Sequence, residues 1–211
     1  MIKVITSPYE QDGYGLKWPS SQIASDLYNH KHLFPRTELI GMDFGCGLGA
    51  HGLLLESIDE FSKIIYIDKD EIALKKVMEL RKASSRMVKR QFCHQLEEIL
   101  DLRLNVIIDR ASLQHCTLEE LEIILDNFFR LLSTGSLGNN LISSKGLLIS
   151  EWIYSAPRES QIKRFSNITF FSEAEQLINS KFKIISKKVT SIEHIGKNTK
   201  FVIINSVLQP I

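Results

Sequence analysis

Short apolar runs alternate with amphipathic stretches along most of the chain. Five runs rich in Ile, Leu and Val are too brief for helices and predict strands, at residues 38–44, 63–68, 86–92, 104–109 and 146–152. Three stretches between them have helical periodicity, at residues 50–58, 71–84 and 117–133. This alternation predicts an α/β fold, in which helices cover both faces of a mostly parallel sheet.

The two ends of the chain depart from this alternation. Residues 19–28 predict a helix that Ser20 or Ser21 caps, and Thr117 with Glu120 has the spacing of a capping box. Near the other end, Ser172 is expected to cap a helix, and residues 182–193 and 198–207 predict an antiparallel hairpin. The segment 133–145 is polar and longer than most connections, which predicts a loop or an insertion.

Composition excludes several classes of protein. The 211 residues fit one domain, and 26 basic against 25 acidic residues give no bulk charge for binding nucleic acid or an anionic membrane. Three cysteines without a CxxC pair, and no export signal, favour a reducing compartment, so we expect a cytoplasmic protein. No apolar run approaches the roughly 20 residues that span a bilayer, so we expect a soluble protein.

Glycines cluster in the stretch MDFGCGLGAHG, residues 42–52. Glycine loses more backbone entropy on folding than any other residue, so Gly45, Gly47 and Gly49 are expected to supply positive φ or a close approach to a ligand. A strand, a glycine turn and a helix in this order place bare amides beneath an anionic group. Asp68 ends the next predicted strand, where a carboxylate can bind ribose hydroxyls. Together these features predict a nucleoside cofactor, and the alternative is a tight turn with a solvated Asp.

Two cofactors fit a glycine turn of this kind. The stretch GCGLGA matches the dinucleotide pattern GxGxxA, so an NAD(P)-dependent oxidoreductase is one alternative. Asp43, however, would repel a pyrophosphate and attract an α-amino group. The first strand also starts late, after an aromatic leader, and the chain ends in a hairpin. These three features favour S-adenosylmethionine.

The quoted residues resemble a known family. The segment DFGCGLG, Asp68, the segment IIDRASLQH and the final hairpin are similar to the class I S-adenosylmethionine-dependent methyltransferases, from about residue 36 onward. The segments GYGLKWPSS (13–21), DRASLQH (109–115) and FFSEAE (170–175) resemble a bacterial subgroup that acts on polysaccharides and small metabolites. The resemblance implies a Rossmann-like, seven-stranded sheet with a C-terminal antiparallel hairpin, the cofactor over the first strands, and the acceptor over the fourth and fifth.

The resemblance also implies which residues bind the cofactor. The glycine turn would pass under its amino acid end, Asp43 would place its amino group, and Asp68 would hold the ribose. Many relatives carry an acidic residue after the third strand, where this chain reads FCHQLEE, so Cys93, His94 or Gln95 must contact the adenine, with backbone amides supplying much of the recognition. The alternatives are a buried thiol for Cys93 and a surface position for His94. The full expected set is Tyr14, Trp18, Asp43, Gly45, Cys46, Gly47, Gly49, Asp68, Lys69, Cys93, His94 and Asp109.

Methyl transfer is an in-line displacement, which needs a base only when the acceptor is a hydroxyl or an ammonium group. The expected catalytic residues follow the fourth strand: Asp109, Arg110 and His115. His115 would be the base, Asp109 would orient it or bind substrate, and Arg110 would pair with an anionic group. The alternatives are that His115 caps the next helix and that Arg110 only neutralises Asp109.

Residues 1–36 are expected to form a lid or cap on a single methyltransferase domain, residues 37–211. In this interpretation Tyr14 and Trp18 fold over the cofactor and exclude water from its sulfonium group. The alternative is that Trp18 only packs the first helix onto the domain.

Other chemistry is less well supported by the sequence. The dipeptides Cys93-His94 and His115-Cys116 lack the spacing of a zinc site, so no metal is expected, and the absence of GxSxG argues against a Ser-His-Asp hydrolase. Arg158, Lys163 and Arg164 suit an anionic acceptor, or form a solvated basic surface. We expect a small-molecule substrate and no nucleic acid or membrane partner. The resemblance to the bacterial subgroup implies O-methyl transfer to a sugar or related metabolite. A non-catalytic S-adenosylmethionine-binding protein is the other alternative, and the sequence does not predict the oligomeric state.

Overall fold

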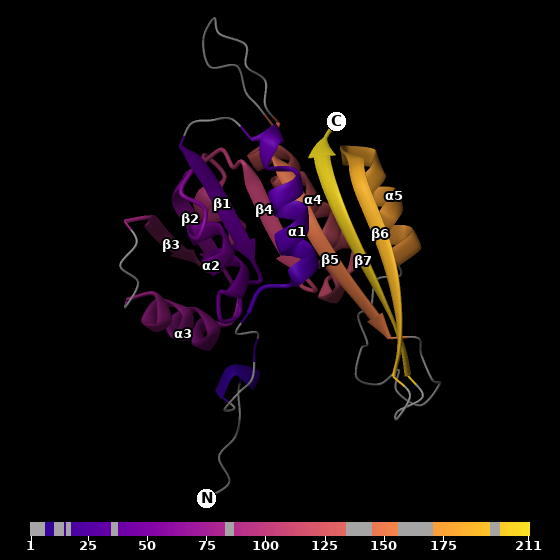
Figure 1. The fold of residues 1–211 in the computed structure, drawn as a ribbon, viewed down its shortest axis with the longest axis horizontal. Helices are drawn as coiled ribbons and strands as arrows, with labels where there is room; N and C mark the ends of the chain where they lie inside the picture. Colours follow the sequence, from indigo (N-terminus) through magenta and orange to yellow (C-terminus); the bar gives the residue numbers. More distant parts are fainter. Residues whose placement is uncertain are drawn as a thin grey trace, which may run out of the picture.

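The computed structural model describes residues 7–10, 15, 18–34, 38–82, 87–133, 145–155, 171–194 and 199–211. They form one seven-stranded sheet with helices on both faces (Figure 1). The strands are β1 (Leu39–Phe44), β2 (Phe61–Ile67), β3 (Lys89–Cys93), β4 (Val106–Arg110), β5 (Leu147–Ser155), β6 (Phe182–His194) and β7 (Thr199–Pro210). The α-helices are α1 (Ser21–Asn29), α2 (Ala50–Glu56), α3 (Glu71–Lys82), α4 (Leu118–Leu132) and α5 (Phe171–Lys181), and the 3-10 helices are η1 (Pro8–Glu10), η2 (Lys31–Leu33), η3 (Leu96–Ile99) and η4 (Leu113–His115).

The strand order is β3-β2-β1-β4-β5-β7-β6. Strands β1 to β5 are parallel, and β7 runs antiparallel to both of its neighbours, β5 and β6. The order reverses between β1 and β4, whose carboxyl ends are in register at Phe44 and Asp109. In open parallel sheets, ligands bind at such a reversal, outside the carboxyl ends of the strands.

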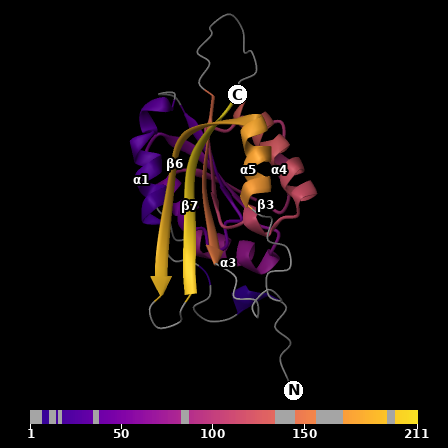
Figure 2. The same ribbon diagram turned by 90° about the vertical axis from the view of Figure 1, so that its right-hand side faces the viewer.

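The core has two layers, one on each face of the sheet. Residues of β2 alternate between them: Ile65 belongs to the layer beneath α4 and α5, and Ile64 and Tyr66 belong to the layer beneath α1, α2 and α3. Figure 2 shows α1 on one side of the sheet and α4 and α5 on the other. Ile23 and Leu27 of α1 are fully buried, so this helix is part of the core. No described helix combines the length and apolar character that crossing a membrane requires.

The element types predicted from the sequence are confirmed, with ends shifted by a few residues. The Thr117–Glu120 capping box is present, and the hydroxyl of Ser20, not that of Ser21, caps α1. The expectation for Ser172 is wrong, because α5 begins at Phe171 and Ser172 lies inside its first turn. Most of the predicted loop 133–145 lies outside the described residues, as do Tyr14, Arg158, Lys163 and Arg164.

Candidate functional site

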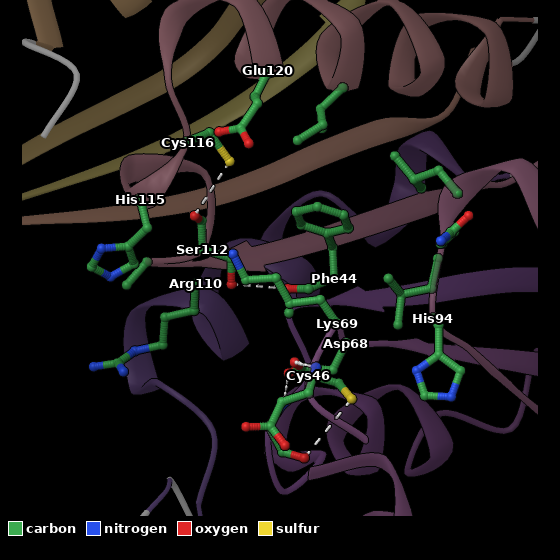
Figure 3. A pocket seen from close by; sticks show the side chains of 18 of the residues that line it. Phe44, Cys46, Asp68, Lys69, His94, Arg110, Ser112, His115, Cys116 and Glu120 are labelled. Carbon is green, nitrogen blue, oxygen red and sulfur yellow. Dashed lines mark hydrogen bonds between the residues drawn. The ribbon is translucent and has the colours of Figure 1, made fainter. Parts of the chain in front are cut away.

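A cavity of about 1100 Å³ opens at the carboxyl ends of β1, β2 and β4 (Figure 3). Its walls come from the glycine turn, the segment after β2, the segment after β3, the β4–α4 connection, one side of α4 and the N-terminal segment around Tyr9. The cavity lies at the edge of the sheet where the glycine turn and Asp68 predicted a ligand.

The glycine turn between β1 and α2 has the backbone that its sequence predicts. Gly45, Gly47 and Gly49 have φ values of 63°, 52° and 74°, in the left-handed region that side chains disfavour. A Cβ at Gly45 would lie 1.9 Å from the Ser112 Oγ. Glycine is therefore required both for the conformation and for the close approach of the β4–α4 connection.

Asp68 follows β2 and lines the cavity, with 8% of its surface exposed. Its Oδ2 accepts a hydrogen bond from the Gly47 backbone N at 2.8 Å, and its Oδ1 accepts one from the Asp70 N at 2.9 Å. A carboxylate can accept about four hydrogen bonds, so capacity for ribose hydroxyls remains. Lys69, beside it, is exposed and also lines the cavity.

Asp43 lies beneath the glycine turn and does not line the cavity. It is 2% exposed, and its Oδ2 accepts a hydrogen bond from the Gly52 N at 2.7 Å. Burial raises the pKa of Asp43 to about 8, and the charges of Asp68 and Asp109 contribute. In the structure this side chain therefore supports the turn and the start of α2, and the contact with an amino group remains a prediction.

The segment after β3 contributes His94 and Gln95 to the cavity wall. Cys93 is 1% exposed and packs in the core, as its alternative interpretation holds. The backbone N atoms of His94 and Gln95 donate to Glu98 Oε1 at 2.7 and 3.0 Å. Because these two amides are already bonded, adenine recognition here would fall to the side chains of His94 and Gln95.

The fourth strand ends in Asp109 and Arg110, whose roles differ. Asp109 is fully buried and accepts hydrogen bonds from Ser150 Oγ at 2.7 Å and from the Ser112 N at 3.1 Å. Burial raises its pKa to about 6. Asp109 fixes the turn after β4 and does not line the cavity, whereas Arg110 does.

His115 ends η4 and lines the cavity beside Cys116. Desolvation, followed by the charge of Lys69, lowers the pKa of His115, so its ring is neutral near pH 7. The residue that caps α4 is Thr117, so the interpretation of His115 as that cap is wrong. Among the described residues, no hydrogen bond joins Asp109 to His115. The prediction that Asp109 orients the His115 ring is therefore not supported by a contact.

The N-terminal segment contributes Pro8, Tyr9 and Gly15 to the cavity. The Ser7 hydroxyl donates to the Asp70 carboxylate, and Lys76 donates to the Tyr9 carbonyl, so this part of the segment is held against α3. Trp18 is 78% exposed and lies outside the cavity wall. Tyr9 was not among the residues predicted from the sequence, where only the aromatic character of the leader indicated a role for this segment.

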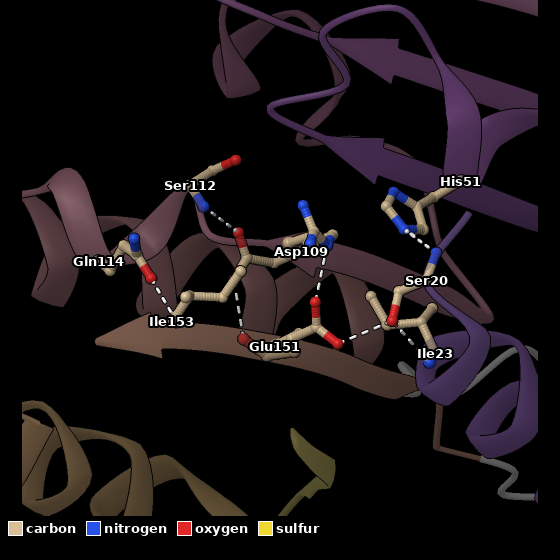
Figure 4. A network of polar contacts seen from close by, with 10 residues as sticks. Ser20, Ile23, His51, Asp109, Ser112, Gln114, Glu151 and Ile153 are labelled. Carbon is tan, nitrogen blue, oxygen red and sulfur yellow. Dashed lines mark hydrogen bonds and ion pairs between the residues drawn. The ribbon is translucent and has the colours of Figure 1, made fainter. Parts of the chain in front are cut away.

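A partly buried polar network, which the sequence did not predict, connects α1, α2, β4 and β5 (Figure 4). The backbone N of Ser20 donates to His51 Nε2 at 3.1 Å, and the Ser20 hydroxyl donates to Glu151 Oε2 at 2.7 Å. Glu151 Oε1 accepts from Arg110 Nε at 2.6 Å. The partner of Arg110 is therefore Glu151, and the alternative in which Arg110 neutralises Asp109 is wrong.

Among the described residues, no three His, Cys, Asp or Glu side chains gather in a way that could bind a metal ion. The three cysteines are free, with Cys46 and Cys93 buried and Cys116 partly exposed. Burial raises the pKa of the Cys116 thiol to about 11 and that of Cys46 well above its ordinary value. These thiols are protonated near neutral pH.

Comparison with solved structures gives matches over nearly the whole chain, whereas no protein-family model and no curated protein sequence matches it. A S-adenosylmethionine-dependent methyltransferase from Methanosarcina mazei is 16% identical, with a TM-score of 0.58 over 87% of this chain and 97% of the other. The N-methyltransferase NodS from Bradyrhizobium japonicum, solved with S-adenosyl-L-homocysteine, is 13% identical, with a TM-score of 0.57 over 95% and 89%. The cyclopropane synthase MmaA2 from Mycobacterium tuberculosis is 10% identical, with a TM-score of 0.64 over 95% and 87%.

Identities this low are evidence for the fold and not for the activity. The strand order, the antiparallel β7 and the site at the β1/β4 reversal agree with the expected architecture. The chain has the Rossmann-like fold of the class I S-adenosylmethionine-dependent methyltransferases.

Proposed function

We propose that this protein is a S-adenosylmethionine-dependent methyltransferase that acts on a small-molecule acceptor. The observation that carries the proposal is the pairing of the glycine turn with Asp68 in one cavity, at the strand-order reversal of this fold. At about 1100 Å³ the cavity exceeds the usual size of a site for one drug-sized ligand, so it has room for a nucleoside and an acceptor.

The proposed arrangement assigns each cavity wall to one part of the ligands. Asp68 accepts hydrogen bonds from the ribose hydroxyls, and His94 and Gln95 contact the adenine from the end of β3. The amino acid part lies over Gly45 and Cys46. The acceptor occupies the side of the cavity next to the β4–α4 connection, which carries His115.

When bound, S-adenosylmethionine supplies an activated methyl group that moves to the acceptor in one displacement. The protein aligns the acceptor atom with this group and excludes water through Tyr9 and the N-terminal segment. The neutral imidazole of His115 takes the proton from a hydroxyl acceptor. We further propose a hydroxyl oxygen of a sugar or related metabolite as that acceptor, because a hydroxyl is one of the two acceptors that need a base, and because the sequence resembles a subgroup that acts on polysaccharides and small metabolites.

The assignment of Asp68 gives the test. Replacing Asp68→Asn removes the negative charge and leaves one acceptor oxygen, with two lone pairs, in place of two oxygens that already accept from the Gly47 and Asp70 amides. Hydrogen bonds to charged groups contribute about 1.5–3 kcal/mol, so calorimetry should show S-adenosylhomocysteine binding weakened about 10- to 100-fold. Asp101→Asn, at an exposed position outside the cavity, is the matched control and should bind as the unmodified protein does. Equal affinity of both variants would remove Asp68 from the cofactor site.

A further inference from the structure

Two side chains of the cavity wall, His51 and Arg110, keep hydrogen-bond donors that no residue described by the structure accepts from. His51 is the second residue of α2 and is 4% exposed, and Arg110 ends β4 with 26% of its side chain exposed. Both side chains line the same cavity, and the hydrogen bonds of Ser20 and Glu151 connect them. The cofactor contacts proposed for the glycine turn and Asp68 use neither of these two side chains.

The guanidinium of Arg110 is held from one side only. Arg110 and Glu151 are paired in the register of β4 and β5, and the Arg110 Nε donates to Glu151 Oε1 at 2.6 Å. Glu151 is 4% exposed, so the carboxylate of this ion pair is shielded from water, whereas the Arg110 side chain is partly exposed. Among the described residues, Nη1 and Nη2 have no hydrogen-bond partner. Four N–H groups of the rigid fork therefore remain for a ligand.

The His51 ring is fixed in one tautomer. Its Nε2 accepts a hydrogen bond from the Ser20 backbone N at 3.1 Å, so Nε2 carries no proton (Figure 4). Burial, and then the charge of Arg110, lowers the His51 pKa to about 4, so the neutral ring carries its proton on Nδ1 at pH 7. Nδ1 has no partner among the described residues. It is a nearly buried donor in a ligand cavity.

One network orients both donors. The Ser20 hydroxyl donates to Glu151 Oε2 at 2.7 Å, so the residue that fixes His51 also contacts the residue that fixes Arg110. A buried donor that lacks an acceptor costs about 1–3 kcal/mol, whereas an anion that fills the gap gains charge-assisted hydrogen bonds. Figure 3 shows Arg110 and His94 on opposite sides of Cys46, so the open donors lie away from the adenine side of the cavity.

We propose that His51 Nδ1 and the Arg110 Nη atoms form a carboxylate-binding subsite, oriented by Ser20 and Glu151. The inference rests on the proposed function for the source of the carboxylate. That source is either the amino acid end of the cofactor or an acidic acceptor. Both present the same planar pair of oxygens to the two donors.

The first arm of the test compares S-adenosylhomocysteine with its decarboxylated analogue, which lacks only the carboxylate. Calorimetric titrations use the unmodified protein, Arg110→Lys and the control Arg103→Lys, at an exposed position outside the cavity. Lysine keeps a positive charge beside Glu151 but lacks the two Nη groups of the guanidinium. Thermal unfolding checks that the variant is folded. If the carboxylate is that of the cofactor, Arg110→Lys weakens S-adenosylhomocysteine about tenfold or more and leaves the analogue unchanged.

The second arm titrates malonate into the free protein and into the protein saturated with S-adenosylhomocysteine. The readout is the NMR signal of the ¹⁵N-labelled His51 ring, with glycerol as the uncharged control. If the carboxylate is that of the acceptor, malonate shifts the His51 signal in the saturated protein, glycerol does not, and Arg110→Lys abolishes the shift.

The outcomes separate this inference from the proposed function. If Arg110→Lys changes neither the preference for S-adenosylhomocysteine nor the response to malonate, the subsite is overturned, while S-adenosylhomocysteine binding leaves the proposed function standing. If the unmodified protein binds no S-adenosylhomocysteine, the proposed function fails. A malonate shift in the free protein then still supports the subsite, and its absence overturns the subsite as well.

Discussion

At the residue scale, the cavity floor consists of backbone conformations that few residues tolerate. Beside the three glycines of the turn stands Ala111, the only non-glycine residue with positive φ, at 61°, in the part of the chain that the structure describes. Its N donates to the Glu151 carbonyl at 2.8 Å, which holds this conformation in place. Strain of this kind, about 1–3 kcal/mol, gathers where the chain must present side chains to a ligand, and Ala111 directly follows Arg110.

The role of His115 can be tested by replacing it with alanine. If His115 is the base for a hydroxyl acceptor, turnover at saturating methyl donor should fall about 100-fold or more, since general-base catalysis contributes about 10²–10⁴. The matched variant is His94→Ala, which changes the cavity wall on the other side and should weaken donor binding with turnover retained. Release of S-adenosylhomocysteine measures both. Unchanged turnover in His115→Ala would show that His115 is not the general base.

The buried Asp43 predicts a pH dependence of stability. Its pKa is about 8 in the folded protein against an ordinary value of 3.8. Its contribution to the free energy of unfolding is therefore complete below about pH 4 and is lost as the pH rises to about 8. The shifts of Asp109, to about 6, and of His51, to about 4, act at lower pH. Between pH 6.5 and 8, unfolding by urea should therefore show a loss of about 1–2 kcal/mol in the unmodified protein.

Asp43→Asn isolates this effect, because the Asn amide oxygen can still accept from the Gly52 N. Its free energy of unfolding should be nearly constant over the same pH interval. A variant with the same loss as the unmodified protein would assign the pH dependence to another group.

At the element scale, polar contacts at the start of α1 connect this helix to the site. Ser20 caps α1 through the Ile23 N, and it also donates to Glu151 on β5. Local sequence predicted a cap at Ser20 or Ser21. Only the tertiary structure distinguishes them, because the second contact joins residues 131 positions apart.

Removing the Ser20 hydroxyl should therefore cost more than the loss of a cap. Ser20→Ala loses about 1 kcal/mol as a cap and leaves Glu151 Oε2 with one donor fewer, for a total of about 2 kcal/mol in the free energy of unfolding. Ser21→Ala, at the exposed neighbouring position, should change stability by less than about 0.5 kcal/mol. Urea unfolding measures both, and equal effects would contradict the assignment of Ser20.

The comparison of elements shows what a single sequence can predict here. Helices and strands were predictable because periodicity and caps are local signals, as at Thr117 and Glu120. The partners of Arg110 and His51 were not, because Glu151 and Ser20 lie on other elements, far along the chain. Asp43 and Asp109 have the expected sequence positions, but their burial beneath the turns is set by packing and not by local pattern.

At the scale of the whole molecule, topology decides where the chemistry is located. The strand order reverses between β1 and β4, so the chain leaves these two neighbouring strands in opposite directions along the sheet. The glycine turn after β1 and the β4–α4 connection both contribute walls of the cavity. The N-terminal segment completes the wall at Tyr9. Residues from distant parts of the chain are thus brought to one edge of the sheet, which is the arrangement that a nucleoside-binding site requires.

The central claim is that this edge binds a sulfonium nucleoside and not a dinucleotide. Calorimetric titration of the unmodified protein with S-adenosylhomocysteine and, separately, with NAD tests it most directly. We predict saturable binding of S-adenosylhomocysteine with one molecule per chain and no measurable binding of NAD. Binding of NAD without binding of S-adenosylhomocysteine would contradict the account.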